Sequence, residues 1–242
     1  HICAAAEDLT RNGANILILS DRNADNNYAP LPSLLALGAV HHHLIREGLR
    51  SQTSLVVEAG DVRETHHFAV LIGFGASAVN PYLTYAAIAE LKRTHNLKKD
   101  LPLHELIRLY NYATDKGILK IMSKIGISTL QSYKGAQIFE ILGIAREVVD
   151  KCFTGAVSRI EGIGFDGIAE ETLLRHRLAY PQQGAYPTQL EAGGVYQWKQ
   201  RGEAHLFNPN TIHLLQYAAR KNDHTAYKKY AQLVNKQSEQ AL

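Results

Sequence analysis

The stretch from Lys120 to Glu140 carries more polar and cationic side chains than an element of a hydrophobic core requires. These side chains are Lys124, Ser128, Thr129, Gln131, Ser132, Tyr133 and Lys134. Glycines at positions 117, 126 and 135 divide the stretch into a predicted helix, a turn, a short extended run and a second helix. The density of hydroxyl, amide and ammonium groups makes this stretch a candidate active site, although no complete catalytic constellation follows from it.

A second group of polar side chains follows three short apolar runs, at residues 16–19, 55–57 and 76–79. Continuous apolar runs of this length predict strands that are buried on both faces, as in parallel sheets. The polar residues after them are Asp21, Arg22, Glu58, Asp61 and Asn80. Ligands of parallel sheets bind at the carboxyl ends of the strands, so these five are candidate ligand-binding residues. Ordinary loop chemistry is the competing explanation.

The remaining reactive residue types lack the spacing that known catalytic or metal sites require. His41, His42 and His43 are consecutive on a predicted helix, where side chains turn by roughly 100° per residue, so the three cannot bind one metal ion. His43 and His67 are conceivable partners from different helices. The sequence has no HExxH, GxSxG, GxGxxG or P-loop pattern. Gly162 and Gly164 predict a turn.

Helical patterns alternate with the three predicted strands. They cover residues 2–12, 32–49, 68–72 and 82–91. Three strands alternating with helices predict right-handed βαβ units, a parallel sheet and an α/β architecture. Further helices are predicted over residues 103–114, 144–153, 165–177 and 211–235, with an irregular segment rich in Pro, Gly, Gln and Tyr over 180–209. The expected fold is therefore an α/β domain followed by an irregular and helical C-terminal extension.

Composition excludes several classes of protein. The 242 residues are 45% hydrophobic, which is enough for a substantial core. A formal net charge of +3 does not favour nucleic-acid binding, and no apolar run approaches the roughly 20 residues of a membrane span. Cys3 and Cys152 form no pair motif, and both are expected to be buried, inert thiols in a reducing compartment. The chain begins at His1 and not at Met, so we expect a piece of a longer protein.

Five phrases of the sequence carry a resemblance to a known family. They are ILILSDR, PLPSLLALGAVHHHLIREGLR, SLVVEAGDVRETHHFAVLIGFGASAVNPYL, KIMSKIGISTLQSYKGAQIFEILG and FNPNTIHLLQYAAR. In this order they closely resemble the large subunit of glutamate synthase, or the single chain of the ferredoxin-dependent form. The resemblance covers essentially the whole chain. It implies that residues 1–164 are the later part of a central domain and that residues 165–242 are a linker and the start of the FMN-binding synthase domain.

The resemblance also implies the chemistry of the parent enzyme, an oxidoreductase of glutamate biosynthesis and ammonia assimilation. Such enzymes hydrolyse glutamine in an amidotransferase domain, pass ammonia through a tunnel, and condense it with 2-oxoglutarate to an imine that reduced FMN reduces. Electrons arrive through an iron–sulfur cluster from NAD(P)H or ferredoxin. The implied partners are the amidotransferase and FMN synthase domains of the same polypeptide, and a small subunit or ferredoxin. The implied location is the cytoplasm, or the plastid stroma in a photosynthetic eukaryote.

This chain departs from the catalytic parts of that family. The amidotransferase needs an N-terminal cysteine and the cluster needs three nearby cysteines, whereas this chain begins at His1 and has two distant cysteines. We therefore expect no catalytic residue, metal or cofactor in this piece, which is expected to be inactive alone. The resemblance implies a connector similar to an incomplete or degenerate (β/α) barrel, which positions two active sites.

Within such a connector, the stretch from Lys120 to Glu140 acquires a different role. Lys124, Ser128, Gln131, Ser132 and Tyr133 are candidates to line the ammonia passage or to face the synthase domain, and interdomain hydrogen bonding alone is the competing interpretation. Two other functions stay open: a free-standing α/β protein that binds small anions at Arg22, Arg63 and the strand ends, and a pure scaffold segment.

Overall fold

The computed structural model describes residues 1–94, 97, 101–181 and 193–237. By its contacts the chain divides into two compact units, residues 1–182 and residues 183–242. Among the described helices, none is long and apolar enough to cross a membrane.

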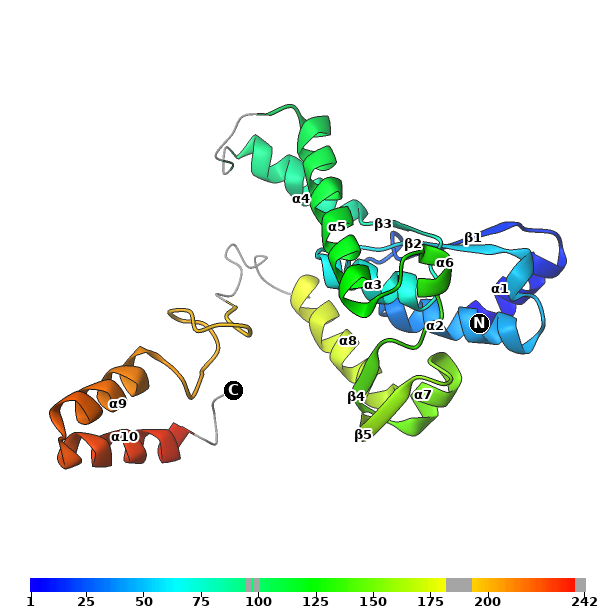
Figure 1. Ribbon diagram of the computed structural model, residues 1–242. Helices are drawn as coiled ribbons and strands as arrows, with labels where there is room; N and C mark the ends of the chain where they lie inside the picture. The colour runs from blue at the N-terminus through cyan, green and yellow to red at the C-terminus, as the bar shows by residue number, and fades with distance from the viewer. Residues whose placement is uncertain (95–96, 98–100, 182–192, 238–242) are drawn as a thin grey trace. The chain divides into compact units, whose positions relative to one another are not determined.

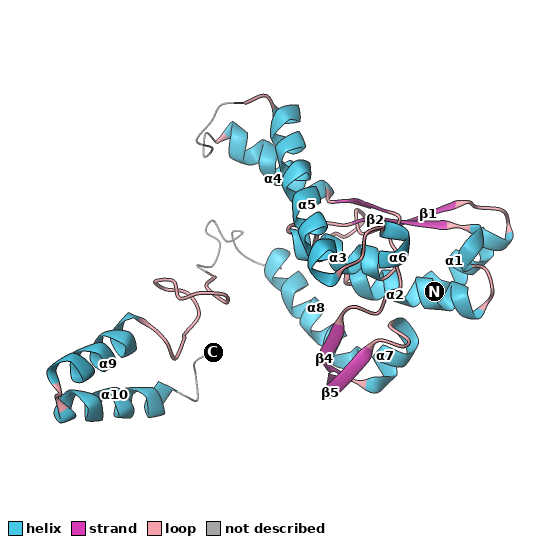
Figure 2. Cartoon of the chain, in the orientation of Figure 1, coloured by secondary structure: helices cyan, strands magenta, loops and turns pink. Residues whose placement is uncertain are grey.

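The first unit begins with alternating helices and strands (Figures 1 and 2). The elements in order are α1 (Ile2–Arg11), β1 (Ile16–Ser20), α2 (Ser33–Arg46), the 3-10 helix η1 (Arg50–Gln52), β2 (Ser54–Glu58), α3 (Thr65–Gly73), β3 (Ala78–Asn80) and α4 (Tyr82–Arg93). The strands form a parallel sheet in the order β1-β2-β3, as the sequence predicts. Gly13, which follows the C-cap residue Asn12 of α1, has a left-handed φ of 91° and ends that helix.

Within the described residues the sheet is covered on one face only, which corrects the prediction that its strands are buried on both faces. The helices of the βα units pack against the inward side chains, and Leu17, Leu55 and Val57 are at most 5% exposed. On the opposite face Ile16 and Ile18 of β1 are 62% and 64% exposed. An apolar run does not reveal whether a second layer exists, because that layer comes from another part of the molecule.

Two helices form an antiparallel arm next to this sheet. The second of them, α5 (Leu103–Ile125), packs against both α4 and α3 and is longer than the predicted helix over residues 103–114. Gly117 lies inside α5, where a Cβ would collide with Thr65 of α3. This glycine therefore permits close helix packing and does not end the helix, which ends instead at Gly126 with a left-handed φ of 81°.

The rest of the first unit differs from the sequence prediction. After the short helix α6 (Leu130–Tyr133) come β4 (Glu140–Ile144), α7 (Arg146–Cys152), β5 (Val157–Ile163) and α8 (Phe165–Ala179). The predicted extended run is a helical turn, the helix predicted after it is β4, and the turn predicted around Gly162 lies within β5. These two strands form a separate parallel sheet with register shifts, and α7 packs on α2. The fold is thus mixed α/β with short parallel sheets, and within the described ranges no sheet closes into a barrel.

The second unit contains two packed helices, α9 (Pro209–Lys221) and α10 (His224–Gln237), in place of the one helical region predicted over residues 211–235. Asn208 caps α9, since its side chain accepts hydrogen bonds from the backbone N–H groups of Asn210 and Thr211. Asn222, with a φ of 49°, separates the two helices. Part of the predicted irregular segment, residues 182–192, lies outside the described residues.

Candidate functional site

The carboxyl ends of the three strands bring polar side chains together around Glu58. The register pairs Ser20 with Glu58 and Glu58 with Asn80, so the three side chains point to the same face of the sheet. One carboxylate oxygen of Glu58 accepts a hydrogen bond from the Ser20 hydroxyl at 2.7 Å, and the other accepts from the Asn80 amide at 3.0 Å. Arg22 Nε lies 2.8 Å from that second oxygen. Hydrogen bonds from Arg22 and Ser20 lower the pKa of Glu58, so its negative charge is stabilised.

Asp21 extends this cluster toward the start of α4. Its carboxylate accepts hydrogen bonds from the backbone N–H of Gly60 at 2.9 and 3.1 Å. The guanidinium carbon of Arg22 lies 4.1 Å from the centre of the Tyr82 ring. Burial, followed by the interaction with Asp21, raises the pKa of Tyr82 to about 12, so this phenol stays protonated at neutral pH. Each charged group therefore has a partner within the cluster.

Asp61, the fifth strand-end candidate, has a separate role. Its Oδ2 atom accepts a hydrogen bond from the backbone N–H of Ser33 at 3.1 Å, at the first residue of α2. A carboxylate at this position satisfies a free helix N–H group and interacts favourably with the helix dipole. The structure thus brings together Asp21, Arg22, Glu58 and Asn80, and places Asp61 at a helix terminus.

A cavity of about 330 Å³ opens beside the same strand ends. Ser20, Asp21 and Glu58 line it together with apolar residues that include Leu19 and Leu31. Arg22, the cation expected to bind a small anion, is already paired with Glu58 and stacked on Tyr82. The two carboxylates and the engaged guanidinium do not favour a small-anion site at this edge.

Sequence reasoning did not include Ser20 and Tyr82 among the candidates. The sequence contained a signal for both residues. Ser20 ends the first apolar run, and Tyr82 follows the third run after Asn80 and Pro81. Residues that close a strand belong to the same edge of the sheet as the loop residues after them.

The stretch from Lys120 to Glu140 is attached to α3 by two hydrogen bonds. The hydroxyl of Tyr133, a fully buried residue, donates to the carbonyl of Ala69 at 3.1 Å, and the N–H of Gly135 donates to the carbonyl of Gly73 at 2.9 Å. Thr129 caps α6 by accepting from the N–H of Ser132 at 3.3 Å. The stretch is therefore an ordered part of the first unit.

The five tunnel or interdomain candidates in this stretch fall into two groups. Lys124, Ser128, Gln131 and Ser132 are exposed on the surface of the unit, whereas Tyr133 is enclosed in its core. A role for these residues in a passage or an interface stays a prediction. The four exposed side chains are the ones that another domain can reach.

The histidines form structural contacts with different partners. His41 Nδ1 accepts a hydrogen bond from Arg50 Nε at 2.9 Å, and His67 Nδ1 accepts from the N–H of Arg63 at 3.0 Å at the start of α3. His43 Nε2 lies 2.8 Å from a Glu7 carboxylate oxygen. The rings of His41 and His42 are in edge contact with their centroids 5.0 Å apart, whereas His43 and His67 have separate partners.

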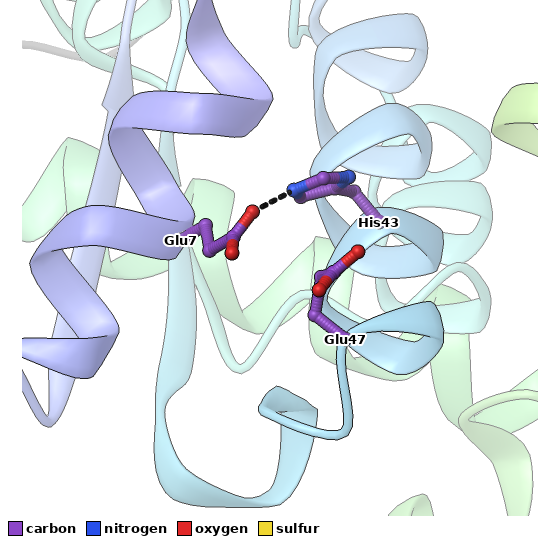
Figure 3. A group of neighbouring side chains, drawn as sticks. All are labelled: Glu7, His43 and Glu47. Atoms are coloured by element: carbon purple, nitrogen blue, oxygen red, sulfur yellow. Dashed lines mark hydrogen bonds and ion pairs between the residues drawn. The ribbon is translucent and has the colours of Figure 1, made fainter.

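Glu7, His43 and Glu47 point toward one another and are the described residues whose ligand atoms could hold a metal ion, all within 4.8 Å (Figure 3). Arg11, however, forms ion pairs with Glu7 at 2.8 Å and with Glu47 at 3.3 Å. The hydrogen bonds of Arg11 and His43 lower the pKa of Glu7. Because the carboxylates already have cationic and hydrogen-bonding partners, the geometry favours an ion-pair network that joins α1 to α2 over a metal centre.

Comparisons with known proteins agree with the resemblance found in the sequence. Residues 1–145 match the family model of the glutamate synthase central domain. The chain is 47% identical over 232 residues to the glutamate synthase [NADPH] large chain of Bacillus subtilis, covering 96% of this chain and 15% of that protein. It is 44% identical over 231 residues to glutamate synthase [NADH] of Schizosaccharomyces pombe, covering 95% and 11%.

A plant relative shows the same extent of similarity. Ferredoxin-dependent glutamate synthase 1, chloroplastic/mitochondrial, of Arabidopsis thaliana is 40% identical over 242 residues, covering 96% of this chain and 15% of that protein. The chain thus spans between 11% and 15% of the length of these three relatives.

Proposed function

This chain belongs to the glutamate synthase family, and we propose that within a full-length glutamate synthase it connects the amidotransferase and FMN synthase domains and helps to enclose the passage for ammonia. The match of residues 1–145 to the central-domain model carries this proposal. The reaction of the whole enzyme is the conversion of glutamine, 2-oxoglutarate and reductant to two molecules of glutamate. In this proposal the piece holds the two catalytic domains in position and carries out no catalytic step itself.

The proposed domain division follows the resemblance. Residues 1–164 form the later part of the central domain, and residues 165–242 form the linker and the start of the FMN-binding synthase domain. Three consecutive parallel strands with helices on one face are the arrangement found in a (β/α) barrel, which supports an incomplete or degenerate barrel as the fold of the central domain.

The internal pairing of the strand-end cluster supports a connecting role. Glu58 is held by Ser20, Arg22 and Asn80, and the Asp21 carboxylate is held by the Gly60 N–H. A catalytic carboxylate needs a substrate or a mobile proton as its partner, whereas these two carboxylates stabilise loops. The cluster therefore fixes the edge of the sheet from which the loops to α2 and α3 emerge.

FMN and the iron–sulfur cluster of the parent enzyme are assigned to other parts of the polypeptide. The amidotransferase and synthase domains are the partners of this piece, and a small subunit or ferredoxin is the electron donor of the whole enzyme. The location is the cytoplasm or, in a photosynthetic eukaryote, the plastid stroma.

Exposed polar side chains after α5 provide the test. Ser128 and Gln131 are both exposed, so a larger apolar side chain at either position is compatible with the fold of this unit. In the full-length enzyme, Ser128→Leu and Gln131→Leu are expected to lower glutamine-dependent glutamate formation while glutamine hydrolysis and ammonia-dependent glutamate formation persist. Gln52→Leu, at an exposed position in η1, is the matched control.

The ratio of glutamate formed to glutamine hydrolysed is the decisive measurement. A ratio that is the same in the wild type, in both variants and in the control would exclude a role for this surface in ammonia transfer. A lower ratio for Gln52→Leu as well would show a general loss of domain contact and no specific passage.

A further inference from the structure

A second cavity of about 330 Å³ lies within the first unit, apart from the strand-end cluster. Its walls come from α2, from the end of α3, from residues 135–139 before β4, and from residues 154–156 between α7 and β5. The hydrogen bond from the Gly135 N–H to the Gly73 carbonyl joins two of these walls. Small-molecule sites occupy about 300–1,000 Å³, so this cavity suits one or two fused rings and not a larger cofactor.

Two partly buried imidazole rings supply hydrogen-bonding groups to this cavity. His41 Nδ1 accepts from Arg50, so the ring proton lies on Nε2, and no described residue accepts from that N–H. Neither nitrogen of His42 has a hydrogen-bond partner within the described ranges. Burial is the main cause that lowers the pKa of His41 to about 4 and the pKa of His42 below its usual value, so both rings are neutral at pH 7. Neutral rings offer both donors and an acceptor to a ligand.

Gln137 stands at the rim of the cavity in an unfavourable backbone conformation. Its φ of 54° lies in the left-handed region, which residues other than glycine seldom adopt. Its side-chain amide packs against Gly155 and forms no hydrogen bond with any described residue. Backbone strain of this kind persists at ligand-binding positions, where the strained residue contacts the ligand. The free carboxamide therefore adds a donor and an acceptor beside the two imidazoles.

The charge of the cavity restricts the class of ligand. Among the described residues that line it there is no carboxylate, ammonium or guanidinium group. A buried anion needs a cationic partner and a buried amine an anionic one, so charged ligands are disfavoured. The described side chains that could together hold a metal ion are Glu7, His43 and Glu47, which lie outside this lining. The rings of Phe74 and Phe139, whose planes are 25° apart, add apolar surface for a flat molecule.

We propose that this cavity binds a small uncharged heteroaromatic molecule with a cyclic amide edge, of the pyrimidine-base class. In this assignment the His41 Nε2–H donates to a ring carbonyl, and the Gln137 carboxamide oxygen accepts from a ring N–H. His42 supplies a further donor or acceptor, and the phenylalanine rings contact the ligand ring. This binding site goes beyond the connecting function proposed above and does not depend on it.

Binding of uracil by the full-length polypeptide that contains this chain tests the proposal. Uracil is flat and uncharged and has ring carbonyls beside ring N–H groups, and orotate is the same ring with a carboxylate. In ligand-observed NMR titrations at neutral pH, we expect a dissociation constant of about 1 mM or below for uracil. Orotate should bind at least about tenfold more weakly. No uracil binding at up to about 10 mM, or orotate binding as tight as that of uracil, would overturn the proposal.

Two variants test whether the ring binds in this cavity. Gln137→Gly removes the carboxamide and relieves the left-handed backbone, and His42→Phe keeps a flat ring but removes both nitrogens. Each should weaken uracil binding at least about tenfold, and Gln137→Gly should not lower the melting temperature. Asn222→Gly is the matched control, because it relieves a left-handed φ of 49° at a residue outside the lining of the cavity. It should leave the uracil affinity unchanged.

The variants also separate a binding role from a structural one. Equal uracil affinity in the wild type, Gln137→Gly and His42→Phe would place the bound ring elsewhere and overturn the proposal. A lower melting temperature for Gln137→Gly would show that Gln137 supports the fold, and the affinity of His42→Phe would then decide. The ammonia-transfer test is independent, because Ser128 and Gln131 do not line this cavity. Failure of that test leaves uracil binding in place, and absence of uracil binding leaves the ammonia-transfer test unaffected.

Discussion

His41 is expected to make the stability of this chain fall steeply as the pH drops from about 6.5 to 4. Its Nδ1 atom accepts a hydrogen bond from Arg50, so the proton of the neutral ring lies on Nε2. Arg50 also donates to the carbonyls of Thr53 at 2.6 Å and Gly75 at 2.9 Å, which fixes the guanidinium against the ring. Burial, then the charges of Arg50 and His42, lower the pKa of His41 from 6.5 to about 4.

The sign of the effect follows from the number of protons bound in each state. Above pH 6.5 His41 is neutral in both states, and its titration changes nothing. As the pH falls below 6.5 the unfolded chain binds a proton that the native ring rejects, so stability is lost until the native ring also titrates near pH 4. At about pH 4.5 the linkage relation gives a loss of about 2.5 kcal/mol. Because the ring is only partly buried, solvent screening reduces this to about 1.5 kcal/mol.

His41→Asn isolates this contribution, because the asparagine oxygen can still accept from Arg50 and does not titrate. Urea denaturation followed by far-UV circular dichroism at about pH 7 and pH 4.5 gives the free energy of unfolding of each variant. The wild type should lose about 1.5 kcal/mol more than His41→Asn over this interval. His104→Asn, at an exposed position in α5, should behave like the wild type. Equal losses in the wild type and His41→Asn would refute the reasoning.

Four further outcomes test other parts of the structure. Tyr133→Phe removes the buried bond to Ala69 and should lower the free energy of unfolding by about 1 kcal/mol in urea denaturation, whereas Tyr112→Phe, at an exposed position, should not change it. Gly38→Ala should destabilise by about 1–3 kcal/mol in the same assay, although alanine favours helices, because its Cβ would collide with the Cys152 carbonyl and the Phe153 ring. Burial raises the pKa of Cys152 to about 11, so a thiol reagent should modify Cys3, which is partly exposed, and reach Cys152 only after unfolding. Millimolar Zn²⁺ should leave the melting temperature unchanged because Arg11 pairs with Glu7 and Glu47, and a clear rise would contradict the ion-pair interpretation.

The first sheet could be predicted from the sequence because its signals are local. The runs around Leu17, Leu55 and Val79 contain the β-branched and aliphatic residues that favour strands, and polar residues end each run. The exposure of Ile16 and Ile18 was not predictable in this way. A residue's propensity describes its own backbone, whereas burial depends on a second layer that other segments provide.

The second sheet was missed because its sequence contradicts ordinary strand patterns. β4 contains Gly143 with a φ of 74°, and β5 contains Gly162, at which a Cβ would collide with the backbone of Gly143. Glycine in a strand interior usually indicates a turn or a bulge, and here it permits close contact between two irregular strands. The pairing of these glycines is a tertiary fact that neither segment displays alone.

The location of the strand-end site could be predicted from the sequence. The hydrogen bonds and ring contacts among its residues could not. Parallel topology places Asp21, Arg22, Glu58 and Asn80 at one edge, which the order of elements already indicates. The register decides that Ser20 and Asn80 both reach Glu58, and the start of α4 decides that Tyr82 stacks on Arg22. Distances of 2.7 to 3.0 Å depend on these pairings, which a single sequence does not specify.

Two surfaces are candidates to contact other domains, and they differ in the free-energy cost of their exposure to water. Ser128 and Gln131 form hydrogen bonds with water when exposed, so their position on the surface does not require a partner. Ile16 and Ile18 lose the free energy of apolar burial, about 25 cal/mol for each Å² left in water, and no described strand pairs with the outer edge of β1. The stronger demand for a neighbouring segment therefore comes from the open side of the first sheet.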